Sequence, residues 1–149
     1  MFRIVLVAPE IPHNAGAAGR LALATGSTLH LVKPLGFSLD DKHVRRAGLD
    51  YWQDVEVHVW DDFAALQTAH PNGRFWFLST KGTQHHWDTD FAPGDFLVLG
   101  CETRGLPESL LAAHHGQVLR IPMQESSTRS LNLATSAAIV IYEAWRQNK

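Results

Sequence analysis

The chain has 149 residues, of which 45% are hydrophobic, and this size predicts one domain (1–149) with a sizeable core. Its formal net charge of −2 argues against a general nucleic-acid coat protein, so any RNA binding must use a local patch. The single cysteine excludes an internal disulfide, and no segment has the order of a signal peptide or the length of a membrane span, so we expect a cytoplasmic protein.

The first third of the chain alternates short β-rich runs with helical patterns. Residues 4–9 (IVLVAP) and 29–34 (LHLVKP) are predicted strands. Between them, 14–26 has helical spacing and ends at a glycine that suits a C-cap. Residues 40–48 (DDKHVRRAG) are predicted to form a second helix, whose acidic start suits the helix dipole.

The rest of the chain continues the alternation. The run 55–60 alternates as a strand does, and Asp61-Asp62 lead into a predicted helix that stops before a proline. Near-continuous apolar runs at 75–80 and 95–100 are typical of strands buried on both faces. A short helix (107–114), a strand (118–122) and a last helix (131–145) follow. The pattern predicts an α/β fold with a mostly parallel sheet and helices on both faces.

Three segments have features of a binding site. The run LVLGCETRGLP (97–107) follows a buried strand, and its two glycines and proline indicate a tight loop that fixes Glu102 and Arg104 at the rim of the sheet. The strand VLRIPM (118–123) leads through a polar loop to SLNL (130–133), where a helix N-terminus offers backbone N–H groups to a ligand.

The third segment, PEIPHNAGAAGR (9–20), follows a strand and opens a helix but lacks the G-x-G-x-x-G spacing of dinucleotide-binding loops. Asn14 and Arg20 lie on either side of the helix start, so both could approach one site at the carboxyl end of the strand. The alternatives are that Asn14 is an N-cap and that Arg20 is a surface charge.

Two further features bear on partners. Lys42-His43-x-Arg45-Arg46 is the best candidate for an RNA-binding patch, with a solvated helix face as the alternative. The last helix is apolar around most of its circumference from Leu131 to Tyr142, which favours a subunit interface as well as burial against the sheet.

Metal binding is not indicated. The nine histidines show neither an H-E-x-x-H nor a Cys-x-x-Cys pattern, so solvated loop histidines are the preferred interpretation. A thiol nucleophile formed by Cys101 with His115 is disfavoured, because no Asp or Asn partner is evident.

The three segments, in this order, resemble the SPOUT class of RNA methyltransferases, in its SpoU-like 2′-O-methylating branch. GFSLDDKHVRRAGLDYW (36–52) and LSTKGT (78–83) extend the resemblance over nearly the whole chain. Within that branch the chain looks like the small enzymes that methylate the wobble ribose of leucine tRNAs. The resemblance implies a C-terminal trefoil knot, a homodimer built partly on the last helix, and the anticodon stem-loop of tRNA as partner.

The resemblance also implies S-adenosylmethionine as methyl donor, bound largely by backbone groups, with no metal. The implied cofactor-binding residues are Leu78, Thr80, Gly100, Glu102, Ile121, Ser130 and Leu131. The implied catalytic residues are Arg20, Glu102 and Asn132, and the implied RNA-binding residues are Asn14, Arg20, Lys42, Arg45, Arg46 and Tyr142. Because arginine keeps its proton to about pH 12, we expect Arg20 to stabilise the 2′-alkoxide rather than to act as a base, with a nearby RNA phosphate or Glu102 helping to take the proton.

Two rival functions stay open. One is 2′-O-methylation of another tRNA ribose or of a ribosomal RNA ribose, which the short chain without an added RNA-binding domain disfavours. The other is a non-catalytic RNA- or nucleotide-binding module, which the joint presence of Arg20, Glu102 and Asn132 disfavours.

Overall fold

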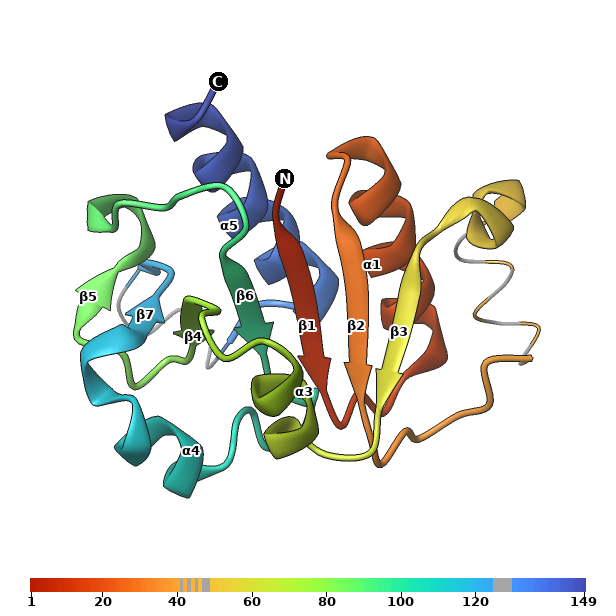
Figure 1. Cartoon of the computed structure of the whole chain (residues 1–149), viewed down its shortest axis with the longest axis horizontal. Coiled ribbons are helices and arrows are strands. Elements are labelled where there is room, and N and C mark those ends of the chain that lie inside the picture. Colours follow the sequence, from red (N-terminus) through yellow and green to blue (C-terminus); the bar gives the residue numbers. More distant parts are fainter. Residues whose placement is uncertain (41, 43, 45, 47–48, 125–129) are drawn as a thin grey trace.

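The computed structural model describes residues 1–40, 42, 44, 46, 49–124 and 130–149. These residues form a seven-stranded, all-parallel sheet in the order β3-β2-β1-β6-β4-β7-β5 (Figure 1). The strands are β1 (Arg3–Val7), β2 (Thr28–Val32), β3 (Val57–Trp60), β4 (Phe75–Leu78), β5 (Gln84–His85), β6 (Phe96–Leu99) and β7 (Val118–Arg120). The α-helices are α1 (Pro12–Ala24), α3 (Phe63–Ala69), α4 (Glu108–Ala113) and α5 (Leu133–Gln147), and the 3₁₀ turns are η1 (Leu49–Asp54), η2 (His86–Asp88) and η3 (His115–Gln117).

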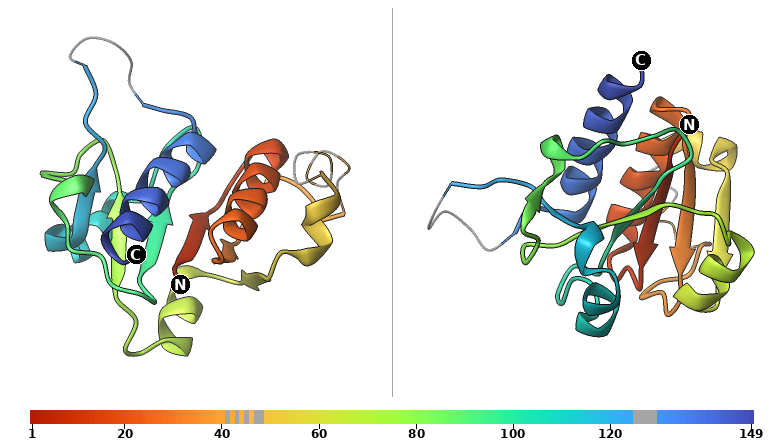
Figure 2. Two further views of the ribbon diagram at one scale, coloured as in Figure 1. Left: turned by 90° about the horizontal axis from the view of Figure 1, so that it is seen from above. Right: turned by 60° about the vertical axis from the view of Figure 1, so that its left-hand side comes forward.

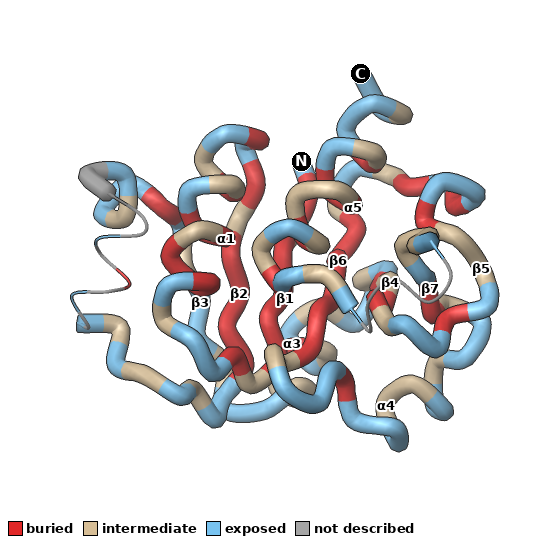
Figure 3. The backbone as a smooth tube through the Cα atoms, turned by 180° about the vertical axis from the view of Figure 1, so that it is seen from behind, coloured by how far each residue is buried: buried red, intermediate tan, exposed pale blue. Residues whose placement is uncertain are grey.

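The central strands are buried on both faces, as their near-continuous apolar sequences predict. In β1, Ile4 and Leu6 face one core cluster while Val5 and Val7 face the other. Figure 3 shows this burial as red tube through β1, β2 and β6. A strand covered on both sides needs an apolar residue at every position, which is why these runs show no alternation.

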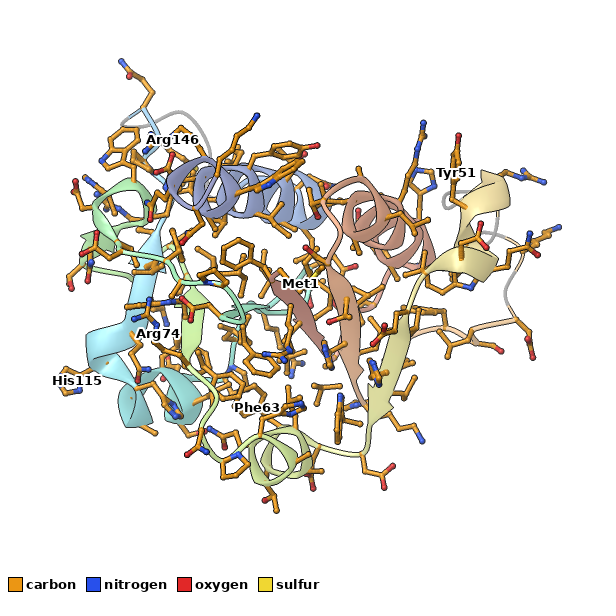
Figure 4. The ribbon with its side chains drawn as sticks, turned by 45° about the horizontal axis from the view of Figure 1, so that its top comes forward. Met1, Tyr51, Phe63, Arg74, His115 and Arg146 are labelled. Atoms are coloured by element: carbon orange, nitrogen blue, oxygen red, sulfur yellow. The ribbon has the colours of Figure 1, made fainter. Side chains whose placement is uncertain are left out.

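Helices cover both faces of the sheet, which confirms the predicted layering. Helices α1 and α5 lie side by side on one face, while α3 and α4 lie on the other (Figure 2). Leu66 of α3 and Leu110 and Leu111 of α4 pack into the second cluster, and Figure 4 shows Phe63 of α3 beside the sheet. Among the described residues, no helix is long and apolar enough to cross a membrane.

Helix boundaries follow local chemistry. Helix α1 begins with Pro12 in its first turn, where a missing N–H costs nothing, two residues earlier than predicted. It ends before Gly26, whose φ of 64° is the left-handed conformation expected of a C-terminal glycine. The N-cap of α3 is Asp62, whose carboxylate accepts a hydrogen bond from the Ala65 amide at 2.7 Å. Of the predicted helix 40–48, residues 42, 44 and 46 are helical and its remaining central residues lie outside the described ones.

The preference for solvated loop histidines is wrong at two positions. His30 lies in β2 with 3% of its surface exposed, and its ring nitrogens pair with Thr28 and Trp60. His86 in η2 is also buried. A histidine inside an apolar strand such as β2, or in a short turn such as η2, leaves no signal in hydrophobic periodicity, so the sequence pattern did not show that these two residues are buried.

The parallel arrangement sets where a ligand binds. The loops that follow β1, β4, β6 and β7 emerge at the carboxyl edge of the sheet, the edge at which open α/β sheets bind ligands. The two chain ends lie at the opposite edge (Figure 1), where the Met1 carbonyl accepts a hydrogen bond from Gly94 and Asn148 donates one to the Phe91 carbonyl.

Candidate functional site

A cleft of about 480 Å³ opens at the carboxyl edge, between the loops that follow β4, β6 and β7 and the start of α5. Its volume falls in the usual range for small-molecule sites, about 300–1,000 Å³. The structure brings together around it every residue that the sequence analysis assigned to the cofactor: Leu78, Thr80, Gly100, Glu102, Ile121, Ser130 and Leu131. Asn14 and Asn132 also line it.

The loop after β6 closes on itself through two glycines. The Gly105 amide donates to the Cys101 carbonyl at 2.9 Å, and Gly105 has a φ of 69°. A Cβ at Gly100 would lie 2.1 Å from the carbonyl carbon of Gly105, so no larger residue fits there. The sequence G-C-E-T-R-G therefore fixes a tight turn that presents Glu102 to the chain segment after β1.

Two acidic side chains join this turn to that segment in a reciprocal clamp. Both oxygens of Glu102 accept backbone N–H groups, from Glu10 and from Ile11, each at 2.8 Å. In return the Glu10 carboxylate accepts the Thr103 amide at 2.9 Å and its hydroxyl at 2.8 Å. These bonds from Thr103 hold the pKa of Glu10 below its usual value. Sequence reasoning missed Glu10, because no local pattern identifies a partner 93 residues away.

Asn14 extends the clamp to α5. Its side-chain nitrogen donates to Glu102 at 3.1 Å, and its side-chain oxygen accepts from the Asn132 side chain at 3.1 Å. Asn132 is itself the N-cap of α5, accepting the Thr135 amide at 3.2 Å. The alternative that Asn14 is an N-cap is wrong: Ile11 occupies that position, and Asn14 lies in the first turn, 5% exposed.

These contacts bear on how Glu102 acts. Its two oxygens already accept three N–H groups, so the carboxylate is held in place by the chain itself. A group in that position holds the walls of the cleft together. The arrangement favours a positioning role for Glu102 over the acceptance of a proton.

Arg20 does not line the cleft of its own chain. It lies six positions after Asn14 in the helix, so the two side chains are rotated by about 240° relative to each other around α1. Arg20 is exposed, and its guanidinium carbon lies 5.9 Å from the ring centre of Tyr51, which projects from η1 in Figure 4. Within one chain, therefore, the expectation that Asn14 and Arg20 approach one site is wrong.

Of the other predicted RNA-binding residues, Asn14 lines the cleft, whereas Lys42, Arg46 and Tyr142 do not. Lys42 and Arg46 are exposed and one helical turn apart, while Arg45 lies outside the described residues. Tyr142 is 47% exposed on α5, and its ring centre is 5.7 Å from that of Trp145. Trp145 is 41% exposed, so it does not belong to the buried face on which Leu133 and Ile141 lie.

The cleft is lined by three cations that sequence reasoning did not assign to a site together. Lys81 and Arg104 lie in the turns after β4 and β6, and Arg120 is the last residue of β7; among the described lining residues Glu102 is the one carboxylate. Over the residues that the structure describes, no group of three or more His, Cys, Asp or Glu side chains is arranged to hold a metal ion.

Comparisons with known proteins bear on this site. The model of the SpoU rRNA methylase family matches residues 1–142. A tRNA (cytidine(34)-2′-O)-methyltransferase of Saccharophagus degradans is 52% identical over 151 aligned positions, which cover 99% of this chain and 96% of that protein. A solved structure described as giving insights into the 2-OH methylation of C/U34 on tRNA has a TM-score of 0.95 and 44% identity, covering 99% of this chain and 96% of the other. The SpoU methyltransferase AviRb of Streptomyces viridochromogenes, solved with the cofactor AdoMet, has a TM-score of 0.83 and 25% identity, covering 98% of this chain and 57% of the other.

Proposed function

The chain belongs to the SpoU rRNA methylase family, and from this premise we propose that it transfers a methyl group from S-adenosylmethionine to the 2′-hydroxyl of the wobble ribose of leucine tRNAs. The observation that carries the proposal is the cleft at which hydrogen bonds among Glu102, Asn14 and Asn132 join three distant segments. The names of the relatives support a tRNA acceptor at position 34.

The cleft fits the cofactor in size and chemistry. Leu78, Ile121 and Leu131 supply apolar walls suited to an adenine ring, and Gly100 brings backbone close to it. When bound, S-adenosylmethionine supplies an electrophilic methyl group to the ribose oxygen. Calorimetry should find about one site per chain, with an affinity that a chelator does not change. Absence of binding would overturn the cofactor assignment.

In the proposed mechanism, this chain's residues position the acceptor and stabilise charge. Ser130 and Asn132, at the start of α5, orient the nucleotide, while Glu102 holds the loop that faces it. Arg20 stabilises the 2′-oxygen as the hydroxyl proton passes to a neighbouring phosphate of the RNA. That contact requires a guanidinium within hydrogen-bonding distance of the acceptor, and Arg20 does not line its own cleft. We therefore infer that Arg20 acts in the cleft of a second copy of the chain.

The proposed homodimer uses α5. Tyr142 and Trp145 form an exposed aromatic pair on this helix, and paired exposed aromatic rings are typical of interface centres. Light scattering at micromolar concentration should give twice the chain mass. Replacing Tyr142 by Glu should shift the protein to a monomer, whereas Tyr51→Glu, at another exposed tyrosine, should not. A wild-type monomer would refute the dimer.

Mixing two inactive variants tests whether Arg20 serves the partner. An Arg20→Ala chain keeps an intact cleft, and a Gly100→Val chain keeps Arg20 but loses its cleft. Mixed dimers of the two should regain up to one working site in two, because one chain supplies Arg20 and the other the cleft. If neither mixing nor co-expression restores activity, Arg20 works within its own chain or not at all.

The acceptor is tested directly. Transfer of tritiated methyl to bulk tRNA, followed by mass spectrometry of the modified nucleotide, should place the label on C34 or modified U34 of leucine tRNAs. Label on another tRNA ribose or on ribosomal RNA would select the rival target.

A tRNA acceptor puts the proposed reaction in the cytoplasm. Lys42, Arg45 and Arg46 are proposed to contact the anticodon stem-loop outside the cleft.

The proposed chain path includes the C-terminal trefoil knot that the resemblance implies. In support, β7 lies between β4 and β5, both of which precede it in the chain. The segment that leads from β7 to α5 therefore starts inside a sheet already bounded on both sides.

A further inference from the structure

Positive charge gathers at the cleft of a chain that is negative overall. The whole chain has a formal net charge of −2, whereas the lining residues that the structure describes include Lys81, Arg104 and Arg120 against one carboxylate, Glu102. The cations come from the turn after β4, the turn after β6 and the last residue of β7. They therefore approach the cleft from three separate segments.

These three cationic side chains make few strong contacts with other residues that the structure describes. Arg104 is exposed and donates no hydrogen bond to any residue that the structure describes, and nearby Glu10 is already held by Thr103. Arg120 is exposed, and its guanidinium nitrogen Nη2 lies 3.3 Å from Nε2 of the His85 ring. Lys81 pairs with Glu108 at 2.8 Å, but both side chains are largely exposed, and exposed pairs of this kind stabilise little.

The cofactor does not account for the charge either. S-adenosylmethionine carries a sulfonium and an ammonium group against one carboxylate, so three further cations around it would be unfavourable. A polyanion at the mouth of the cleft would instead be attracted by all three. The acceptor of the proposed reaction is such a polyanion, with one phosphate on either side of each ribose.

We propose that Lys81, Arg104 and Arg120 form a phosphate-binding surface at the mouth of the cleft, which holds the RNA backbone on both sides of the acceptor nucleotide. This proposal rests on the proposed function and names the groups that would hold the substrate there. The surface is separate from the segment containing Lys42 and Arg46, which does not line the cleft.

Salt dependence of RNA binding tests the surface. The dissociation constant of a fluorescent leucine tRNA is measured by anisotropy over a series of KCl concentrations for wild type, Arg104→Gln and Arg120→Gln. Each substitution should raise the dissociation constant by about 3- to 10-fold near 100 mM KCl. It should also reduce the slope of the logarithm of the dissociation constant against the logarithm of the KCl concentration by about 0.7. Lys149→Gln is the matched control: it removes the same charge at the opposite edge of the sheet and should change neither quantity.

Glu108 provides a test of opposite sign. Its carboxylate competes with phosphate for Lys81, so Glu108→Gln should tighten tRNA binding by about 2- to 5-fold and steepen the salt slope. A merely structural role for the Lys81–Glu108 pair predicts no gain. Because the expected change is an improvement, misfolding cannot imitate it.

The outcomes separate this proposal from the proposed function. If wild type methylates tRNA but both arginine variants keep its affinity and slope, the phosphate-binding surface is refuted while the function stands. If the variants instead lose affinity for S-adenosylmethionine by calorimetry with tRNA binding unchanged, the cations serve the cofactor carboxylate and the surface is also refuted. If wild type binds tRNA with the expected salt response but transfers no methyl group, the surface stands and the proposed function fails.

Discussion

The side chain of Asn132 donates a hydrogen bond to the side chain of Asn14 at 3.1 Å, which joins residues 118 positions apart. Asn14 passes the connection to Glu102, so one buried amide ties the start of α1, the turn after β6 and the start of α5. An asparagine suits this position because one end of its amide donates while the other accepts.

Replacing Asn14 should therefore weaken both the fold and the cleft. Asn14→Ala should lower the free energy of unfolding by about 1–3 kcal/mol, because it removes two side-chain hydrogen bonds, one to Glu102 and one to Asn132. Asn14→Asp should cost more, since it sets a second carboxylate against Glu102. Urea denaturation measures the first effect and S-adenosylmethionine calorimetry the second, with exposed His13→Ala as the neutral control. Equal stability of the Asp and Ala variants would contradict the hydrogen-bond assignment.

Arg20→Ala should lower kcat by about 10²–10³-fold, as expected for the loss of one oxyanion-stabilising group. Affinity for S-adenosylmethionine should stay nearly constant, because Arg20 does not line the cleft of its own chain. Tyr51→Leu, which removes the aromatic ring beside the Arg20 guanidinium, should lower kcat by a smaller factor. Steady-state kinetics with tRNA separates these effects. A raised KM at unchanged kcat would make Arg20 a positioning residue instead.

Asp95 should be important for stability and irrelevant to the cleft. It is 2% exposed and accepts hydrogen bonds from Arg74, Trp76 and the Ala92 amide, at 2.9–3.1 Å. Asp95→Ala should lower the free energy of unfolding by about 2–4 kcal/mol, because it removes the acceptor of these hydrogen bonds, while the half-exposed Arg74 guanidinium stays accessible to water. Thermal melts measure the loss, and exposed Asp90→Ala is the control. An Asp95→Ala protein as stable as wild type would contradict the importance of this group.

Stability should fall in mild acid because of His30. Burial, followed by the charges of His58, His70 and Arg3, lowers its pKa from 6.5 to about 3. Above pH 6.5 the ring is neutral in both the folded and the unfolded chain. Below it the unfolded chain takes up a proton and the folded chain does not, so stability falls as the pH drops from about 6.5 to about 3, by at most about 1.4 kcal/mol per pH unit.

Urea denaturation at several pH values measures this slope. His30→Leu should be less stable near neutral pH, since it leaves the Trp60 N–H without its acceptor, but its acid slope should be shallower by up to one proton. His115→Gln removes an exposed histidine, which points away from the fold in Figure 4, and should keep the wild-type slope. An unchanged slope in His30→Leu would show that other groups control the acid response.

The layers of the fold were predictable because each rests on a local signal. Apolar runs mark the buried strands β4 and β6, and Gly26 and Asp62 mark helix ends. The two-residue strand β5 leaves no such signal. The strand order was also out of reach, because β6 inserts between β1 and β4 through pairings of residues far apart in the chain.

The candidate site likewise has some features that could be predicted from local sequence and others that could not. The glycines of the turn after β6 and the start of α5 identified segments that line the cleft, since both are local features. The clamp between Glu10 and Thr103 was missed, and the direction of Arg20 was misjudged. The clamp depends on how two distant segments approach in space, which the spacing of residues in the sequence does not determine. The direction of Arg20 depends on its rotation around α1, which the prediction of one shared site did not take into account.

The clamp that joins residues 10–14, 102–103 and 132 also has a kinetic consequence. Ile11 and Asn14 line the cleft together with residues from 78 to 136, so the complete cleft, and with it full cofactor binding, can appear only after these distant segments have met. In refolding from urea, recovery of S-adenosylmethionine binding should lag behind recovery of helical circular dichroism, because long-range contacts form at greater entropic cost than local helices. Cofactor binding is thus a reporter of completed folding rather than of secondary structure.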